Sequence, residues 1–241
     1  MTDTPGAQLL DVMTGTLTLT NDLSTEFPNY ALQIESGATV ILASNQNIKT
    51  LNILGNGRLD VGAYTISINY GSNADPIASI IAAIQTGYAA GTWGGAGIMS
   101  SAAATANSSY ALGYADSADA GNPAGLPSGT IEIRYTLLGD ANLDGKVNGT
   151  DFAITAANFN ESVTSWDQGD FNYDGKVNGT DFALLLQNFN QAVTQTAITP
   201  SASAQTIQRS SSSTLSAILD SQSDDIVVKV INQKSKNKSR R

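Results

Sequence analysis

The chain contains the unit Gly139-Asp-Ala-Asn-Leu-Asp-Gly-Lys-Val-Asn-Gly-Thr-Asp-Phe152 and repeats it as Gly169-Asp-Phe-Asn-Tyr-Asp-Gly-Lys-Val-Asn-Gly-Thr-Asp-Phe182. The offset is 30 residues (169 − 139), and the segment from Asp144 to Asp151 recurs unchanged in the second copy. Numbered from its first aspartate, each copy has oxygen-bearing side chains at positions 1, 3, 5, 9 and 12 and glycine at position 6. Two copies with one spacing indicate a function that depends on the spacing itself.

This spacing is that of a 12-residue calcium loop. A hard cation such as Ca²⁺ takes about six to eight oxygen ligands, and glycine at position 6 allows the sharp turn that wraps the chain around it. Position 7 contributes its backbone carbonyl, so lysine is acceptable there. The predicted ligands of two Ca²⁺ ions are Asp140, Asn142, Asp144, Lys146, Asn148 and Asp151, then Asp170, Asn172, Asp174, Lys176, Asn178 and Asp181. The alternative is a pair of Asp/Asn/Gly-rich turns without metal, which two matching copies disfavour.

A helix is predicted after each loop, because apolar residues recur there at helical spacing. Neither loop has a helix before it: residues 131–137 alternate like a strand, and residues 162–168 form a short connection that contains Trp166. The two copies are expected to pair, with Val147 facing Val177 in a short β-bridge. The helix residues expected to share one small core are Phe152, Phe159, Phe182, Leu185, Leu186 and Phe189.

These loop–helix repeats resemble a type I dockerin over about residues 138–192. The resemblance implies calcium binding and docking onto a cohesin-like protein partner, as in secreted bacterial assemblies that degrade polysaccharides. Dockerins often have Ser-Thr at loop positions 10 and 11, where this chain has Gly149-Thr150 and Gly179-Thr180. The later helix positions, 156–157 and 186–187, also lack the basic character that is usual in the family.

The composition excludes several classes of chemistry. The 241 residues are 41% hydrophobic and 14% charged, and they include no Cys and no His. Disulfides, Cys or His nucleophiles and the usual zinc ligands are therefore excluded. The net charge is −9, and two Ca²⁺ ions would change it to −5 (−9 + 4).

Residues 15–70 are predicted to form short strands, because apolar residues recur two apart with Thr and Asn between or beside them. Val40 and Leu59 begin similar segments 19 residues apart (59 − 40), as in the rungs of a short parallel β-solenoid. The alternative is an antiparallel sandwich. Such strands resemble the repeats of autotransporter-like and other secreted bacterial surface proteins.

One helix is predicted near residues 75–87, with Asp75 as N-cap and Pro76 at its first position. Its isoleucines at 77, 80, 81 and 84 are interpreted as core rather than as a binding groove. Trp93, Tyr110 and Tyr114 could stack on sugar rings, and burial is the favoured interpretation.

Three regions are therefore predicted: a β-rich domain over 1–137, the dockerin-like module over 138–192, and a Ser/Thr-rich linker with a basic tail over 193–241. We expect the last region to be largely disordered, although residues 224–231 allow a strand or a short helix. Six of the twelve Lys and Arg residues lie from Lys229 onward, which makes an anionic envelope surface a candidate partner.

The expected localisation is secreted or cell-surface. No signal peptide is recognised at Met1-Thr-Asp-Thr-Pro-Gly6 and no long apolar run occurs, so we expect the chain to be part of a longer exported protein rather than a cytosolic one. Nucleic acid is not an expected partner, since the tail lacks interleaved aromatic residues.

The predicted function is that of a non-catalytic calcium-binding module for structural capping or protein docking. The alternative is the attachment end of a polysaccharide-degrading enzyme, a glycoside hydrolase or lyase, whose catalytic part lies outside this chain. Catalysis within the chain is disfavoured, because acids outside the loops are sparse and show no paired arrangement.

Overall fold

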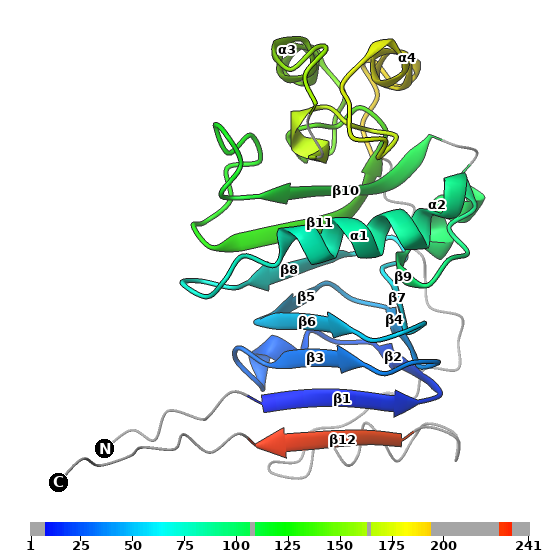
Figure 1. The fold of residues 1–241 in the computed structure, drawn as a ribbon, viewed down its shortest axis with the longest axis vertical. Helices are drawn as coiled ribbons and strands as arrows, with labels where there is room; N and C mark the ends of the chain where they lie inside the picture. The colour runs from blue at the N-terminus through cyan, green and yellow to red at the C-terminus, as the bar shows by residue number, and fades with distance from the viewer. Residues whose placement is uncertain (1–7, 107–108, 163–164, 194–226, 233–241) are drawn as a thin grey trace, which may run out of the picture.

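The computed structural model describes residues 8–106, 109–162, 165–193 and 227–232. Its N-terminal part is a stack of short strands whose neighbours pair in parallel (Figure 1). The first ladder is β1 (Gln8–Thr14), β3 (Ala31–Ile34) and β6 (Thr50–Ile53); the second is β2 (Thr16–Leu19), β4 (Thr39–Leu42), β7 (Arg58–Asp60) and β9 (Gly97–Met99); the third begins with β5 (Gln46–Ile48) and β8 (Thr65–Asn69). The prediction of a mainly β N-terminal part is confirmed.

The register of these ladders explains why the sequence repeats at 19 residues. Leu32 pairs with Leu51 and Val40 pairs with Leu59, so apolar residues stack on apolar residues from one level to the next. Alternate residues of β3 and β4 are buried, and the residues between them, Gln33 and Ile41, are half-buried. A strand buried on one face has this period of two, and the stacked Leu, Val and Ile residues form the core.

The third ladder continues into an antiparallel pair. β8 pairs with β11 (Thr130–Leu137), which pairs with β10 (Tyr110–Asp116). Helix α1 (Ile77–Tyr88) packs beside β9 and buries Ile80 and Ile84, which confirms that its isoleucine stripe belongs to the core. The short helix α2 (Ser101–Thr105) and the 3-10 turns η1 (Leu23–Thr25) and η2 (Ala89–Gly91) complete this part.

Glycines allow α1 to lie directly against the backbone near β9. A Cβ atom on Gly87 would stand 1.8 Å from the carbonyl oxygen of Ile98, and one on Gly95 would stand 1.9 Å from that of Thr86. Both distances are far below van der Waals contact. The glycine-rich segment 87–98 is therefore explained by close packing.

Strand β12 (Val227–Asn232) pairs antiparallel with β1, at the end of the stack opposite the helices α3 and α4 (Figure 1). The structure thus differs from the predicted disordered tail over these six residues and agrees with the strand that residues 224–231 allow. The physical reason is a run of β-branched residues next to the unpaired edge of β1. The other predictions for the linker and the basic tail concern residues outside the described ranges.

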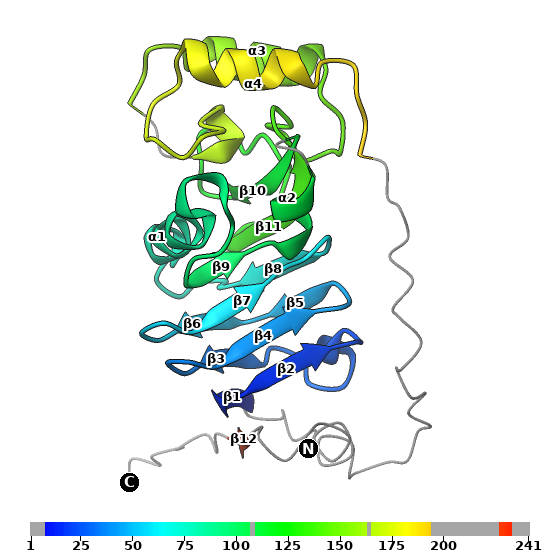
Figure 2. The same cartoon turned by 90° about the vertical axis from the view of Figure 1, so that its right-hand side faces the viewer.

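Residues 138–193 form two loops, each followed by a helix: α3 (Gly149–Ala157) and α4 (Gly179–Gln187). These helices lie side by side at one end of the molecule (Figure 2). The 3-10 turn η3 (Trp166–Gln168) lies in the connection between the two halves. None of the described helices is long and apolar enough to cross a membrane.

The two halves pair reciprocally, and the predicted bridge between Val147 and Val177 is wrong. Val147 donates to the carbonyl of Gln191 (2.9 Å) and accepts from Asn190 (2.8 Å), after α4. Val177, thirty residues later, makes the equivalent contacts after α3. It donates to the carbonyl of Glu161 (3.3 Å) and accepts from the N–H of Asn160 (2.9 Å). Each loop is therefore closed by the end of the other half's helix, which leaves no backbone group of Val147 for Val177.

The exit of the chain from these halves is fastened as well. The N–H of Val193 donates to the carbonyl of Gly145 (2.8 Å), and Lys146 forms an isolated antiparallel bridge with Ala192. At the entry, the side-chain amide of Asn188 donates to the carbonyl of Leu138 (2.9 Å). The entry of the chain is thus held by the second half, and its exit is held by the first half.

The prediction of a shared core made by the two helix stripes is also wrong. Leu185 is fully buried, whereas Phe182 is half-buried. The exposed members of the predicted core are Phe152, Phe159, Leu186 and Phe189. The buried residues come mostly from the loops and the connection instead: Leu138, Ala141, Leu143, Val147, Trp166, Phe171, Tyr173 and Val177.

Loop position 4 joins the two loops to the β-rich part. Tyr173 donates its hydroxyl to the carbonyl of Leu112 (2.9 Å), and its ring centroid lies 4.8 Å from that of Tyr88 and 6.1 Å from that of Trp93. Leu143, at the same position in the first loop, lies against Gly113 of β10. One continuous apolar core results. Trp93 and Tyr114 are buried as predicted, while Tyr110 is half-buried and stacks on Tyr135.

Candidate calcium centre

In the first loop, the carboxylate of Asp140 accepts hydrogen bonds from the N–H groups of Asp144 (3.1 Å) and Gly145 (3.0 Å). The carboxylate of Asp144 accepts from the N–H of Lys146 (2.9 Å), and the amide oxygen of Asn142 accepts from the N–H of Asp144 (3.1 Å). These bonds curl the loop around its own acidic side chains, which brings positions 1, 3 and 5 to one side.

The second loop repeats this geometry. Asp170 accepts from the N–H groups of Asp174 (3.1 Å) and Gly175 (2.9 Å), and Asp174 accepts from the N–H of Lys176 (3.0 Å). The amide oxygen of Asn172 accepts from the N–H of Asp174 (2.9 Å). Two sequences with one spacing have folded into the same local structure.

Left-handed backbone at positions 4 and 6 produces the curl. Gly145 and Gly175 have φ of 84° and 82°, which glycine adopts without strain. Leu143 and Tyr173 have φ of 56° and 62°, which costs a residue with a Cβ some energy. Burial of both side chains against the β-rich part offsets this cost.

Positions 9 and 12 form the start of each helix. Asn148 and Asn178 are N-caps, and each accepts from the N–H two residues later (2.8 Å in both). Asp151 accepts from the N–H groups of Ala141 (2.9 Å) and Asn148 (2.8 Å), which joins the beginning of the loop to its end. Asp181 does the same with Phe171 (3.0 Å) and Asn178 (2.9 Å). The last predicted ligand thus closes each loop.

Burial raises the pKa values of several carboxyl groups in these loops. It raises the pKa of Asp140 to about 7, and the nearby charges of Asp151 and Asp144 act in the same direction. It likewise raises the pKa of Asp170 to about 7, with Asp181 and Asp174 adding to the effect. The pKa values of Asp151 and Asp181 are also raised, again chiefly by burial. Carboxylates removed from water beside one another favour either a proton or a cation.

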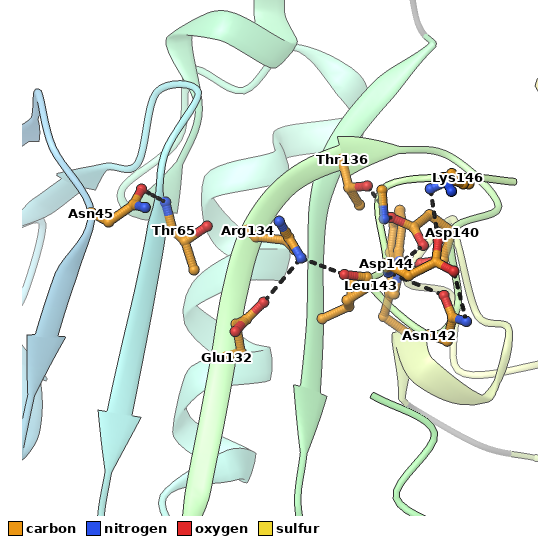
Figure 3. A network of polar contacts seen from close by, with 12 residues as sticks. Asn45, Thr65, Glu132, Arg134, Thr136, Asp140, Asn142, Leu143, Asp144 and Lys146 are labelled. Atoms are coloured by element: carbon orange, nitrogen blue, oxygen red, sulfur yellow. Dashed lines mark hydrogen bonds and ion pairs between the residues drawn. The ribbon is translucent and has the colours of Figure 1, made fainter. Parts of the chain in front are cut away.

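Two residues of β11 hold the first loop, and the motif does not reveal them (Figure 3). The hydroxyl of Thr136 donates to the carboxylate of Asp140. Arg134 donates to the carbonyl of Leu143 and lies 3.5 Å from Glu132. Figure 3 shows both side chains reaching from the strand into the loop. Their alternation along β11 predicts a strand, and nothing in the sequence indicates what they contact.

Trp166 is a third residue that the loop motif does not predict. It is fully buried, and its indole N–H donates to the carbonyl of Asp140 (2.8 Å). Its ring lies 5.6 Å from that of Tyr173, centroid to centroid, so it contacts both loops. The connection between the two halves therefore carries part of the packing that sets the loop geometry.

The donor set fits calcium. Carboxylate, amide and backbone oxygens are the hard ligands that Ca²⁺ prefers, and negative charge is concentrated at both loops. Within the described part of the chain, no three acidic side chains are gathered at metal-binding distance as they stand. Asp144 and Asp174 are exposed, and each accepts a hydrogen bond from the backbone N–H of the lysine two residues later. The assignment of the twelve ligands remains a prediction.

The comparison with protein families agrees with this geometry. Residues 138–190 match the family model of the dockerin type I domain, which confirms the predicted dockerin module. Type I dockerin domains bind calcium and dock onto other proteins. No curated protein and no solved structure matches the chain. The match covers the two loops and both helices, and it leaves the β-rich part without an assigned family.

Proposed function

We propose that this chain is a non-catalytic, calcium-binding part of a secreted or cell-surface protein. Residues 138–190 would bind two Ca²⁺ ions, one in each loop, and would dock a cohesin-like partner. The family match supports calcium binding and protein docking in general. The matching hydrogen bonds of the two loops support one ion in each.

The observation that carries docking is an apolar face on the helix pair. Four large apolar side chains project from it, and their exposed fractions are 43% for Phe152, 45% for Phe159, 58% for Leu186 and 39% for Phe189. Between the helices lies a groove of 420 Å³, lined by Ala156, Phe159, Gly179 and Phe182. Contiguous exposed apolar surface is typical of a binding interface.

The position of the face supports the same function. α3 and α4 lie at the end of the molecule, with the loops between them and the β-rich part (Figure 2). Phe182 holds the rings of Phe152 and Phe159 at centroid distances of 5.3 Å and 5.5 Å, edge to face. A partner would meet a ready-made aromatic surface. Its own surface should be apolar, because positions 156–157 and 186–187 carry no charge.

We also propose that the N-terminal strands form a short parallel β-solenoid that supports the docking module. The three ladders and the 19-residue register support this view. The family match over residues 138–190 supports treating 138–192 as a module distinct from a β-rich domain over 1–137, although the two share one apolar core. The solenoid would then serve as a rigid mount for the module.

The second candidate is the attachment end of a polysaccharide-degrading enzyme whose catalytic part lies outside this chain. A pocket of 370 Å³ on the β-rich part has a mixed lining, with Ile48, Leu126 and two prolines beside polar residues such as Asn47 and Glu132. Glu132 is the one carboxylate in its lining, whereas glycosidases use two across a cleft. This favours a non-catalytic role for the chain itself.

Binding to immobilised type I cohesins tests the docking function. The wild-type chain is expected to bind in the presence of calcium and to dissociate when a chelator is added. A variant with Phe159→Ser and Leu186→Ser should lose binding, because both side chains are exposed parts of the face and not of the core. Met13→Ser is the matched control, since Met13 is 41% exposed on β1, outside the module. Equal binding by the double variant would contradict this surface.

A further inference from the structure

The connection between the two loops contains a buried carboxylate without a partner. Asp167, in η3, has no exposed surface, and neither of its carboxylate oxygens has a hydrogen-bond partner among the described residues. Apart from the amide oxygen of Gln8, these are the only buried side-chain oxygens or nitrogens of the described chain in that state. A buried charge without a partner is strongly unfavourable, so the position needs an explanation.

Further carboxylates face Asp167 from the β-rich part. Asp119, in the turn after β10, accepts a hydrogen bond from the hydroxyl of Ser165, two residues before Asp167. Asp116, 1% exposed at the end of β10, accepts from the hydroxyl of Tyr70 (2.9 Å). Burial raises the pKa of Asp167 to about 9, and the charges of Asp119 and Asp116 act in the same direction. These groups form an acidic junction between the two parts of the molecule.

No described basic side chain neutralises the junction. The ion pair found within the described ranges joins Arg134 to Glu132, on β11. Two ways to relieve the repulsion remain, a bound proton or a bound cation. The hydroxyl of Ser165 donates its one proton to Asp119, so Asp167, which interacts with both groups, receives no hydrogen bond. Such a set of hard oxygens favours the cation.

We propose that Asp167 and Asp119, together with the Ser165 hydroxyl, form a third divalent-cation site, separate from both loops, that takes Ca²⁺. In this site the side chains supply two carboxylates and one hydroxyl. Calcium sites commonly complete six to eight ligands with backbone carbonyls and water. The ion would fasten the connection between the loops to the β10–β11 turn.

Ion counting on the full chain tests the proposal. The chain is dialysed against excess CaCl₂ at neutral pH, and bound calcium is measured by elemental analysis. Asp167→Asn and Asp119→Asn are each expected to bind one ion fewer than the wild-type chain. Asp11→Asn is the matched control, because Asp11 is also buried, lies on β1 and undergoes the same change of charge. It should bind as many ions as the wild type.

An unchanged ion count in Asp119→Asn would overturn the proposal. This variant decides alone if circular dichroism shows that Asp167→Asn does not fold, since Asp119 is only partly buried. An Asp167 that simply holds a proton would give unchanged counts in both variants. Asp144→Ala and Asp174→Ala report on the loops independently, so a failure of the loop sites and a failure of the third site give different results.

Discussion

Thr136 is the residue through which β11 acts on the first calcium loop. Its hydroxyl donates to the carboxylate of Asp140 and is fully buried. We expect Thr136→Val to lower calcium affinity at the first loop on the order of 10-fold, because a supporting hydrogen bond orients the ligand. The second loop should be almost unaffected, and its resonances in an NMR titration provide the internal control. Equal weakening of both loops would instead indicate general destabilisation.

The same carboxylates predict how calcium binding depends on pH. Burial raises the pKa of Asp140 and of Asp170 to about 7 in the calcium-free form. Protonation removes the charge that binds the ion, so protons and Ca²⁺ compete. Affinity should therefore fall as the pH drops below about 7 and level off above it. Titration calorimetry across this range measures it, and a flat profile between pH 5 and pH 8 would contradict the burial of these groups.

At the level of single residues, the sequence predicts the loops better than it predicts their surroundings. Spacing identifies the loop positions because metal coordination and the turn at glycine impose strict chemistry on them. Spacing does not identify Thr136, Arg134 and Trp166 as supports of the loops. Their partners are distant in the fold, and no local sequence pattern indicates these contacts. Asp167 is a similar case, because a carboxylate in a connection is ordinarily exposed.

Among the elements, α1 depends on a glycine for its position. Gly87→Ala would place a Cβ 1.8 Å from the carbonyl oxygen of Ile98, so the helix must shift. We expect a loss of about 3 kcal/mol in the free energy of unfolding, at the upper end for overpacking. Gly94→Ala is the matched control in the same segment, because its nearest contact would be 3.8 Å. Chemical denaturation of both variants gives the comparison, and similar midpoints would contradict the close packing.

Helix α4 offers two adjacent leucines in opposite environments. Leu185 is fully buried and Leu186 is 58% exposed. Leu185→Ala should cost roughly 2–5 kcal/mol of stability, whereas Leu186→Ala should cost less than about 0.5 kcal/mol. Thermal unfolding in excess calcium distinguishes them. If the two variants melted alike, α4 would have to be rotated about its axis.

The helix faces show where sequence reasoning at this scale fails. The apolar stripe of α4 is real, but it does not point into a core as a whole: Leu185 is buried, Phe182 is half-buried, and Leu186 and Phe189 are exposed. Each helix has nine residues, and a short helix buries only what its neighbours cover. Here the loops already fill the space against β10 with Leu143 and Tyr173. Strand alternation, by contrast, predicts the strands themselves correctly, because a period of two leaves one face for the core.

For the whole molecule, calcium should stabilise more than the loops. Tyr173, Trp166 and Leu143 belong to the same apolar core as the strands, so loosening the loops loosens their contacts with β10. Each occupied site should add about 2.7 kcal/mol at a hundredfold excess of calcium over its Kd. Calorimetry with calcium and with chelator should show a higher melting temperature in calcium. Identical transitions in both conditions would exclude calcium as a folding ligand.

The fastening of the chain ends in the module has a mechanical consequence. The N–H of Val193 donates to the carbonyl of Gly145, and the Lys146–Ala192 bridge lies beside this contact, in the loop that follows β11. Tension applied between β11 and the segment after Val193 would load this short bridge, because it spans the two attachment points. The helices would lie outside the line of force. A partner held on their outer face would then experience little of the strain carried along the chain.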